Sequence, residues 1–290
     1  MNSPVRYCAR EFTPVEIETI RALIADNPEA NRARLSRLVC ERLGWRRADG
    51  RLKDMSCRVA MLRMQDDALI DLPAPLKRNG NGTPYRRRTP QAEPELVPIN
   101  APAGAFPDLH LQPVAGRRRS PLWNEYIDRY HYLGYQPLPG AQLRYFACAG
   151  GTLLALLGFG AAAWKTAPRD RFIGWNPAQR ERHLHLVVNN ARFLILPWVR
   201  SRNLASRLLA MATRRLPNDW HERYGYRPVL VETFVETPRF QGTCYKAANW
   251  LQLGDTQGRG KLDVDHSAQL AKKSVWVLPL TTDFRRTLHG

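Results

Sequence analysis

The chain has 290 residues, enough for about two ordinary domains. Its 44% hydrophobic and 24% charged residues are ordinary for a soluble globular protein, which argues against a disordered chain. A net charge of +18 and a pI near 10.3 favour nucleic acid as the partner. The alternative is that the positive charge only reflects an organism whose proteins are generally rich in arginine. A membrane surface is disfavoured, because no basic amphipathic anchor is apparent.

Residues 1–75 are predicted to form a small helical domain. Thr13-Pro14-Val15-Glu16 has the pattern of a capping box with proline at the first helical position. Apolar residues at helical spacing predict a first helix after this box and two more over about 31–43 and 52–65. On the third helix, the side chains expected to face inward are Met55, Val59, Leu62 and Met64.

Three helices followed by a short extended stretch are typical of a helix-turn-helix domain with a rudimentary wing. The recognition helix of such a domain carries basic side chains near its N-terminus. The residues that meet this need, and are predicted to contact DNA, are Arg46, Arg47, Arg51, Lys53 and Arg58. The alternative is a plain three-helix bundle with a solvated basic face.

Residues 76–120 are predicted to be a linker, because proline is frequent there and apolar runs are absent. Two arginine runs, 86–88 and 117–119, mark this segment. Such runs either contact backbone phosphates or only keep the segment soluble.

Residues 121–290 are predicted to form an α/β domain with a mixed sheet, so the whole chain belongs to the α+β class. A helix is expected over 123–130 and a hairpin over 144–157. Further apolar runs predict strands over about 185–188, 192–196, 229–235 and 275–280.

A basic turn follows the strand that ends at Pro197 and opens the next helix. Backbone N–H groups in the first turn of a helix are free, and the helix dipole adds partial positive charge. Arg200, Arg202 and Asn203 therefore form a predicted phosphate site. Gly258-Arg259-Gly260-Lys261 is a second glycine-rich cationic loop, so Arg259 and Lys261 are predicted phosphate contacts, with an ordinary exposed turn as the alternative.

Two residues are candidates for catalysis. Glu232, on a predicted strand, is either a general base or a solvent-facing glutamate paired with an arginine. Tyr245 is either a general acid or base-stacking residue, or an ordinary half-buried aromatic. His183 and His185 lie two apart without an evident third ligand, so no metal site is predicted.

The domain from residue 121 resembles the GNAT acyltransferase fold. In that fold a strand leads into a turn of the pattern Q/R-x-x-G-x-G/A, which binds the pyrophosphate of acyl-CoA. Arg200 and Ala205 match this pattern, and Asn203 replaces its first glycine. Asparagine tolerates the left-handed backbone conformation better than most residues, so the turn can keep its shape. The resemblance implies an acyl-CoA-like donor. Trp250 stands where the fold often places a catalytic tyrosine, which argues against ordinary acetyl transfer.

A second resemblance covers nearly the whole chain. Motifs similar to those of the Druantia anti-phage protein DruA family include 43–56, Tyr132-Leu133-Gly134-Tyr135, 192–197, 203–206, 232–235, 242–250 and 258–260. This resemblance implies a role in bacterial defence islands or mobile elements, and it implies no particular biochemical activity.

Together these observations predict a DNA-binding protein, with double-stranded DNA as the expected ligand, that acts in anti-phage defence or with a mobile element. The first alternative is a GNAT-like group transferase that modifies nucleic acid. The second is an adaptor for a helicase or transposase partner. Five scattered cysteines without a CxxC pair, and no signal-peptide pattern, favour the cytoplasm.

Overall fold

The computed structural model divides into two compact units, Met1–Thr83 and Pro84–Gly290. It describes residues 4–47, 49–76, 85, 87–95, 97–138, 140–237, 239–258 and 270–290, apart from the side chains of Arg117 and Arg118. Each unit has its own hydrophobic core.

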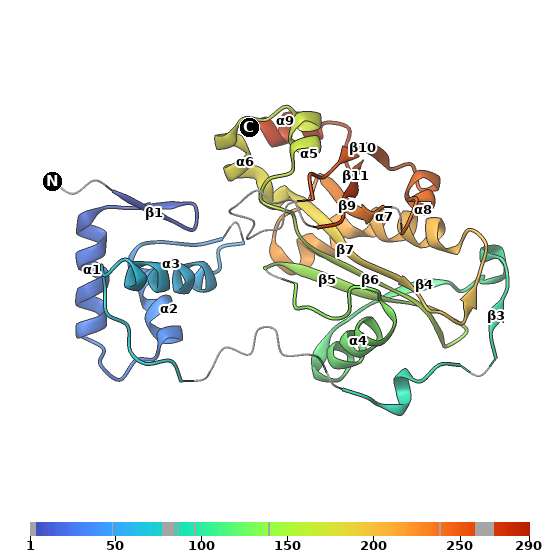
Figure 1. Ribbon diagram of the computed structural model, residues 1–290, viewed down its shortest axis with the longest axis horizontal. Coiled ribbons are helices and arrows are strands. Elements are labelled where there is room, and N and C mark those ends of the chain that lie inside the picture. The colour runs from blue at the N-terminus through green and yellow to red at the C-terminus, as the bar shows by residue number, and fades with distance from the viewer. Residues whose placement is uncertain are drawn as a thin grey trace. The chain divides into compact units, whose positions relative to one another are not determined.

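The first unit contains a hairpin and three helices (Figure 1), with bounds β1 (Val5–Tyr7), β2 (Arg10–Phe12), α1 (Pro14–Ala25), α2 (Arg32–Arg42) and α3 (Asp54–Asp66). The predicted capping box is present. Glu16 N donates to Thr13 Oγ1 at 3.2 Å, and Thr13 N donates to Glu16 Oε2 at 3.0 Å. The predicted helices are therefore confirmed, whereas the assignment to helix-turn-helix proteins stays a prediction.

The inward face of α3 differs from the prediction. Met55 and Val59 are exposed, and the buried residues of the helix are Cys57, Ala60, Met61 and Met64. These four positions follow the i, i+3, i+4, i+7 spacing of one helical face, with alanine and cysteine serving as small core residues. Of the four side chains expected to face inward, only Met64 is buried, because the larger apolar residues Met55 and Val59 lie on the neighbouring face.

The second unit contains a seven-stranded sheet with strand order β10-β11-β9-β7-β6-β5-β4. The strands are β4 (His110–Pro113), β5 (Gln142–Ala149), β6 (Thr152–Ala161), β7 (Val187–Ile195), β9 (Leu230–Glu236), β10 (Leu251–Asp255) and β11 (Lys273–Pro279). All neighbours are antiparallel except β7 and β9, which run parallel. The predicted mixed sheet is thus confirmed. Of its parallel pair, β7 comes before the turn at 200–203 and β9 comes after it.

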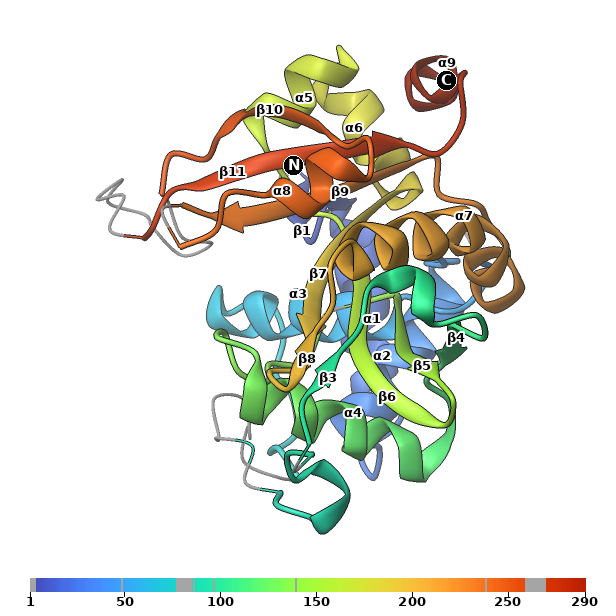
Figure 2. The same cartoon turned by 90° about the vertical axis from the view of Figure 1, so that its right-hand side faces the viewer.

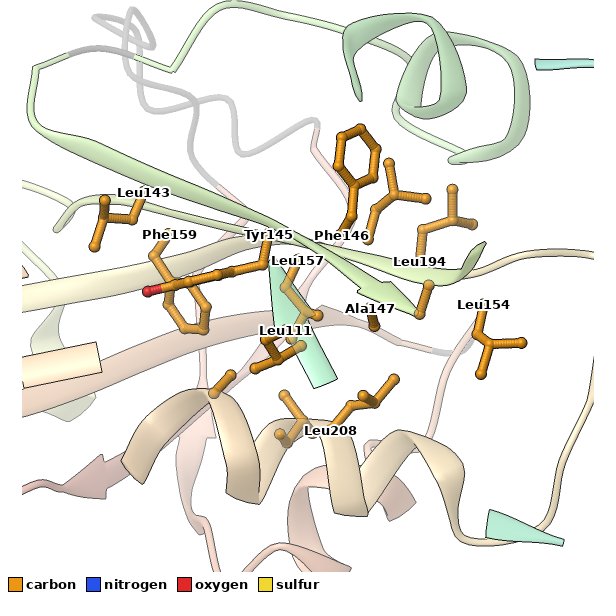
Figure 3. Packing of buried hydrophobic residues seen from close by; sticks show 14 of the residues in the cluster. Leu111, Leu143, Tyr145, Phe146, Ala147, Leu154, Leu157, Phe159, Leu194 and Leu208 are labelled. Carbon is orange, nitrogen blue, oxygen red and sulfur yellow. The ribbon is translucent and has the colours of Figure 1, made fainter. Parts of the chain in front are cut away.

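Helices cover both faces of this sheet. Arg144 on β5 bonds Asn124 and Ser120 of α4 (Gly116–Tyr130), at 2.7 Å each. The next residue, Tyr145, donates to Asp219 of α7 (Leu204–Tyr224) at 2.8 Å. Because successive strand residues point to opposite faces, α4 and α7 lie on opposite sides of the sheet. Figure 3 shows Leu208 of α7 packed toward Leu111 and Leu157 in this core.

Shorter elements complete the second unit. They are η1 (Pro90–Ala92), β3 (Ile99–Asn100), η2 (Ala103–Ala105), α5 (Ala167–Ile173), α6 (Pro177–His183), η3 (Leu184–Leu186), β8 (Val199–Arg200), α8 (Thr243–Ala247) and α9 (Phe284–His289). Short parallel strands β3 and β8 pair with each other. Figure 2 shows β10, β11 and β9 side by side, with α8 close to them.

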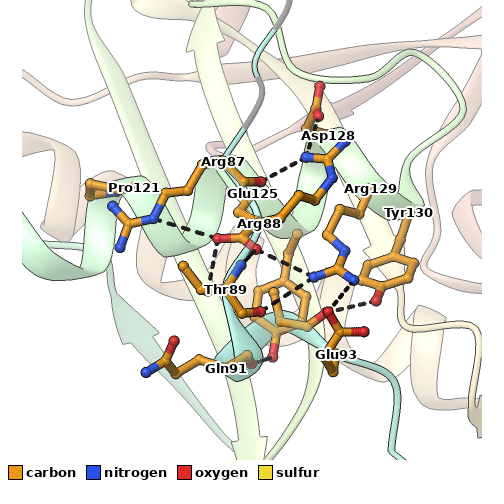
Figure 4. Close-up of polar contacts among 12 residues, drawn as sticks. Arg87, Arg88, Thr89, Gln91, Glu93, Pro121, Glu125, Asp128, Arg129 and Tyr130 are labelled. Carbon is orange, nitrogen blue, oxygen red and sulfur yellow. Dashed lines mark hydrogen bonds and ion pairs between the residues drawn. The ribbon is translucent and has the colours of Figure 1, made fainter.

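Much of the segment predicted as a linker is part of the second unit. Thr89 donates to the fully buried Glu125 of α4, through N at 2.5 Å and Oγ1 at 2.9 Å. Two arginines of the run at 86–88 are paired as well, Arg87 with Glu125 at 3.6 Å and Arg88 with Asp128 at 3.0 Å (Figure 4). Polar contacts to α4 order this segment. Because it has no apolar run, its sequence did not indicate that it packs against the domain.

Candidate functional site

A cavity of about 440 Å³ lies where the two parallel strands separate. Strands β7 and β9 pair only from Val187 with Leu230 to Asn189 with Glu232. Just beyond, Thr233 Oγ1 donates to the carbonyl of Asn190 at 3.0 Å, which closes the fork. The cavity lining comes from the end of α4 and the loop after it, from β7 and β9, from Ala205, and from the segment 240–245.

Tyr245 closes the inner end of this cavity. Its hydroxyl donates to Asn190 Oδ1 at 2.9 Å, while Asn190 Nδ2 donates to the carbonyls of Gly158 and Arg192, each at 3.2 Å. The ring lies against Trp250, with centroids 5.0 Å apart. Burial raises the pKa of Tyr245, so the phenol stays protonated and acts as a hydrogen-bond donor. Tyr245 was a candidate from the sequence, whereas Asn190 and Thr233 were not.

Gly242 shapes the turn that carries Tyr245. Its φ is +71°, and a Cβ at this position would lie 2.7 Å from the ring of Trp276. That ring is buried and cannot move aside without disturbing the core. Only glycine therefore brings this turn close enough to the sheet to place Tyr245 in the cavity.

Glu232 lies on the other face of β9, away from the cavity. It is fully buried and accepts from Arg169 Nη1 and from the amide of Ala163, both at 2.9 Å. Burial raises the pKa of Glu232, and the Arg169 charge opposes that rise. The prediction weighed a general base against a solvent-facing glutamate paired with an arginine. The pairing with an arginine is present, but Glu232 is buried and not solvent-facing, and the alternation of the strand turns it away from the cavity.

The predicted phosphate turn is exposed beside the cavity. Asn203 has φ +64°, so it takes the left-handed conformation in which it replaces the glycine of the GNAT pattern. It immediately precedes α7, whose second residue, Ala205, lines the cavity. Arg200 and Arg202 are exposed, and among the described residues no acidic side chain pairs with either.

The predicted DNA contacts of the first unit fall into two groups. Arg47 and Arg58 both approach Asp54, at 3.8 and 3.7 Å, and are partly neutralised. Arg46 and Arg51 are exposed, and Lys53 is half-buried directly before α3. Within the part of this unit that is described, these last three have no acidic partner.

Two predicted contacts, Arg259 and Lys261, lie outside the described residues. Aromatic residues at the cavity rim were missed: His131, Tyr132 and Phe240 all line it. Tyr132 belongs to one of the motifs of the DruA resemblance, but nothing in the sequence placed it beside Phe240. Over the described ranges, no three His, Cys, Asp or Glu side chains gather as a metal site would require, and no helix has the length and apolarity of a membrane span.

Comparison with protein families gives one match, to the family described as Druantia protein DruA, over residues 63–269. This match covers more than half of the chain. The chain belongs to the DruA family. Membership links it to anti-phage defence, as the resemblance implied. No curated protein matches this DruA family chain.

Solved structures similar to this DruA family chain include acetyltransferases. One from Bacillus subtilis in complex with CoA has a TM-score of 0.34 at 11% identity, covering 60% of this chain and all of that one. An aminoglycoside acetyltransferase with coenzyme A and kanamycin scores 0.41 at 14%, covering 62% and 99%. The ribosomal-protein-S18-alanine N-acetyltransferase from Escherichia coli scores 0.36 at 9%, covering 60% and 96%. At these scores the similarity carries no inference about ligand or activity.

Proposed function

We propose that this DruA family chain binds DNA in anti-phage defence and holds DNA phosphates on the turn at 200–203. The observation that supports this most is the exposure of Arg200 and Arg202 without acidic partners in the described residues. Asn203 and the start of α7 follow directly, so free backbone N–H groups add to the same anion site.

The cations of the first unit extend this proposal. Arg46, Arg51 and Lys53 gather around the start of α3 and offer charge for a second set of phosphates. Phosphate contacts position a protein on nucleic acid, while discrimination between sequences needs contacts to bases. We therefore assign phosphate binding to both units and discrimination between sequences to the first.

A double variant at the turn tests the proposal. Arg200→Gln with Arg202→Gln removes two charge-assisted contacts and is expected to weaken duplex binding about 10- to 50-fold in a gel shift. Arg171→Gln with Arg214→Gln is the matched control, because both arginines are exposed and removal costs the same net charge. Equal loss in both double variants would show that only overall charge matters and would refute a site at the turn.

The cavity also favours a second candidate, a group transferase that modifies nucleic acid. An acyl-CoA-like donor would be held by Arg200, Arg202 and the amides after Asn203, with its arm between β7 and β9. Calorimetry with CoA, run on the same two double variants, separates the candidates. Heat that disappears with Arg200→Gln/Arg202→Gln supports a donor site, and the absence of heat in the unaltered protein rejects it.

A further inference from the structure

The cavity rim carries exposed aromatic side chains from two separate loops. Tyr132 follows α4 and is 37% exposed, while Phe240 precedes α8 and is 45% exposed. Their rings meet edge to face with centroids 5.1 Å apart. His131 stacks on Tyr132 at 4.9 Å, and the Arg239 guanidinium lies 5.0 Å from the Tyr132 centroid. Large rings left in water at the mouth of a cavity mark a binding surface.

The charges around this cavity are separated from its interior. The lining residues include no lysine, arginine, aspartate or glutamate. Arg239 lies over the Tyr132 ring at the rim, and the charge of Arg192 acts on His131 and Tyr132. Other cations are close in sequence to lining residues: Arg200 and Arg202 precede Ala205, and Lys246 follows Tyr245. Arg239 also pairs with Glu236 at 3.4 Å, whereas Lys246 is exposed with no acidic partner among the described residues.

The polar groups of the lining are those that can bond a neutral planar ring. Gln241 and Thr243 are exposed there, beside the hydroxyl of Tyr245 that is already bonded to Asn190. A neutral aromatic interior with cations at its mouth is complementary to a nucleotide, whose base is neutral and whose phosphate is anionic. The volume of about 440 Å³ lies in the range of small-molecule sites and has room for a single nucleotide.

We infer that this cavity receives an unstacked base of a single-stranded nucleic acid, with Tyr132 and Phe240 as its stacking surface. The inference rests on the proposed function, because the turn at 200–203 would hold the phosphates of the same strand. A paired base shows only its edges in the grooves, so entry into a cavity requires an unpaired or flipped nucleotide. This goes beyond the duplex DNA expected from the sequence.

Fluorescence anisotropy on the full chain tests this inference with a single-stranded DNA, an RNA of the same sequence and the DNA duplex. Phe240→Leu keeps an apolar side chain but removes the stacking surface. It is expected to weaken single-strand binding about 5- to 100-fold and to leave duplex binding unchanged. Trp164→Leu is the matched control, since Trp164 is a 50% exposed aromatic outside the cavity lining.

The outcomes separate this inference from the proposed function. If Phe240→Leu binds both single strands as the unaltered protein does, the base site is refuted, even where Arg200→Gln/Arg202→Gln still weakens duplex binding. If no nucleic acid binds at all, both proposals fall. A preference for DNA or RNA identifies the source of the strand.

Photocrosslinking gives a second readout that does not depend on a variant. A strand carrying 5-iodouracil is expected to crosslink to Tyr132 or Phe240, identified by mass spectrometry. Adducts confined to residues outside the cavity lining would overturn the inference.

Discussion

His131 stabilises the loop at the cavity rim through a hydrogen bond to the backbone. The amide of Leu133 donates to His131 Nδ1 at 3.2 Å, so this nitrogen carries no proton and the ring is neutral with its hydrogen on Nε2. Burial lowers the pKa of His131 to about 4, and the positive charge of Arg192 acts in the same direction. The loop that carries Tyr132 thus depends on a histidine that must remain uncharged.

This histidine should make the second unit sensitive to acid. Its pKa is lower in the folded than in the unfolded protein, so its contribution is present above about pH 6.5 and is lost as the pH falls toward 4. Allowing for partial exposure, we expect about 1 to 2 kcal/mol of stability to be lost between pH 7 and pH 5.

His131→Asn is the test variant, because an amide oxygen can replace Nδ1 as acceptor and does not titrate. Urea unfolding at both pH values should show a smaller loss for this variant than for the unaltered chain. The same loss in both proteins would show that other groups cause the acid sensitivity.

At the scale of elements, one buried ion pair joins α5 to β9. Arg169 and Glu232 are both fully buried, and Arg169 also donates to the carbonyl of Ala163 at 2.8 Å and to Asp170. Strand β9 forms one wall of the cavity, so the pair holds that wall from behind. Removing one member of a buried pair leaves the other charge without compensation.

Glu232→Gln is therefore expected to destabilise the second unit by about 3 kcal/mol. Glu222→Gln, an exposed glutamate on α7, is the control and should change stability by less than about 0.5 kcal/mol. Tryptophan fluorescence during urea unfolding reports mainly on the second unit, which holds all the tryptophans except Trp45. A stability equal to that of the control would contradict the structural role given to Glu232.

Elements with a strong local pattern were predictable. The run at 229–235 is β9, and the capping box at Thr13 begins α1. The runs at 185–188 and 192–196 were predicted as two strands and are parts of one continuous strand, β7. Strand β4 was not predictable, because His110–Pro113 lies among prolines and is defined by its pairing with β5. The cavity floor is likewise non-local, since Tyr245 meets an asparagine of a distant strand. Sequence indicated the arginine turn but not the chamber beside it.

At the scale of the whole molecule, the net charge of +18 overstates the charge available to a ligand. Several arginines are already paired with carboxylates inside their own unit, among them Arg87, Arg88 and Arg215. The predicted contacts without acidic partners in the described residues are Arg46, Arg51, Lys53, Arg200 and Arg202.

These five cations set the expected salt dependence of duplex binding. Each neutralised phosphate contributes a slope of about −0.9 in log affinity against log salt, so a fourfold rise in salt should weaken binding roughly 500-fold. Gel shifts between about 50 and 200 mM salt measure this dependence. Affinity that stays within a few-fold over this interval would contradict phosphate binding by these side chains.

Adjacent positions on β9 have opposite chemical demands: Glu232 requires a buried arginine, and Thr233 requires the carbonyl at the fork. If β9 slipped by a single residue, the carboxylate of Glu232 would point into the neutral cavity. The guanidinium of Arg169 would then face the hydroxyl of Thr233 in place of a carboxylate. Glu232 and Thr233 therefore fix the register of β9 in the sheet. In that register, no carboxylate of β9 enters the cavity.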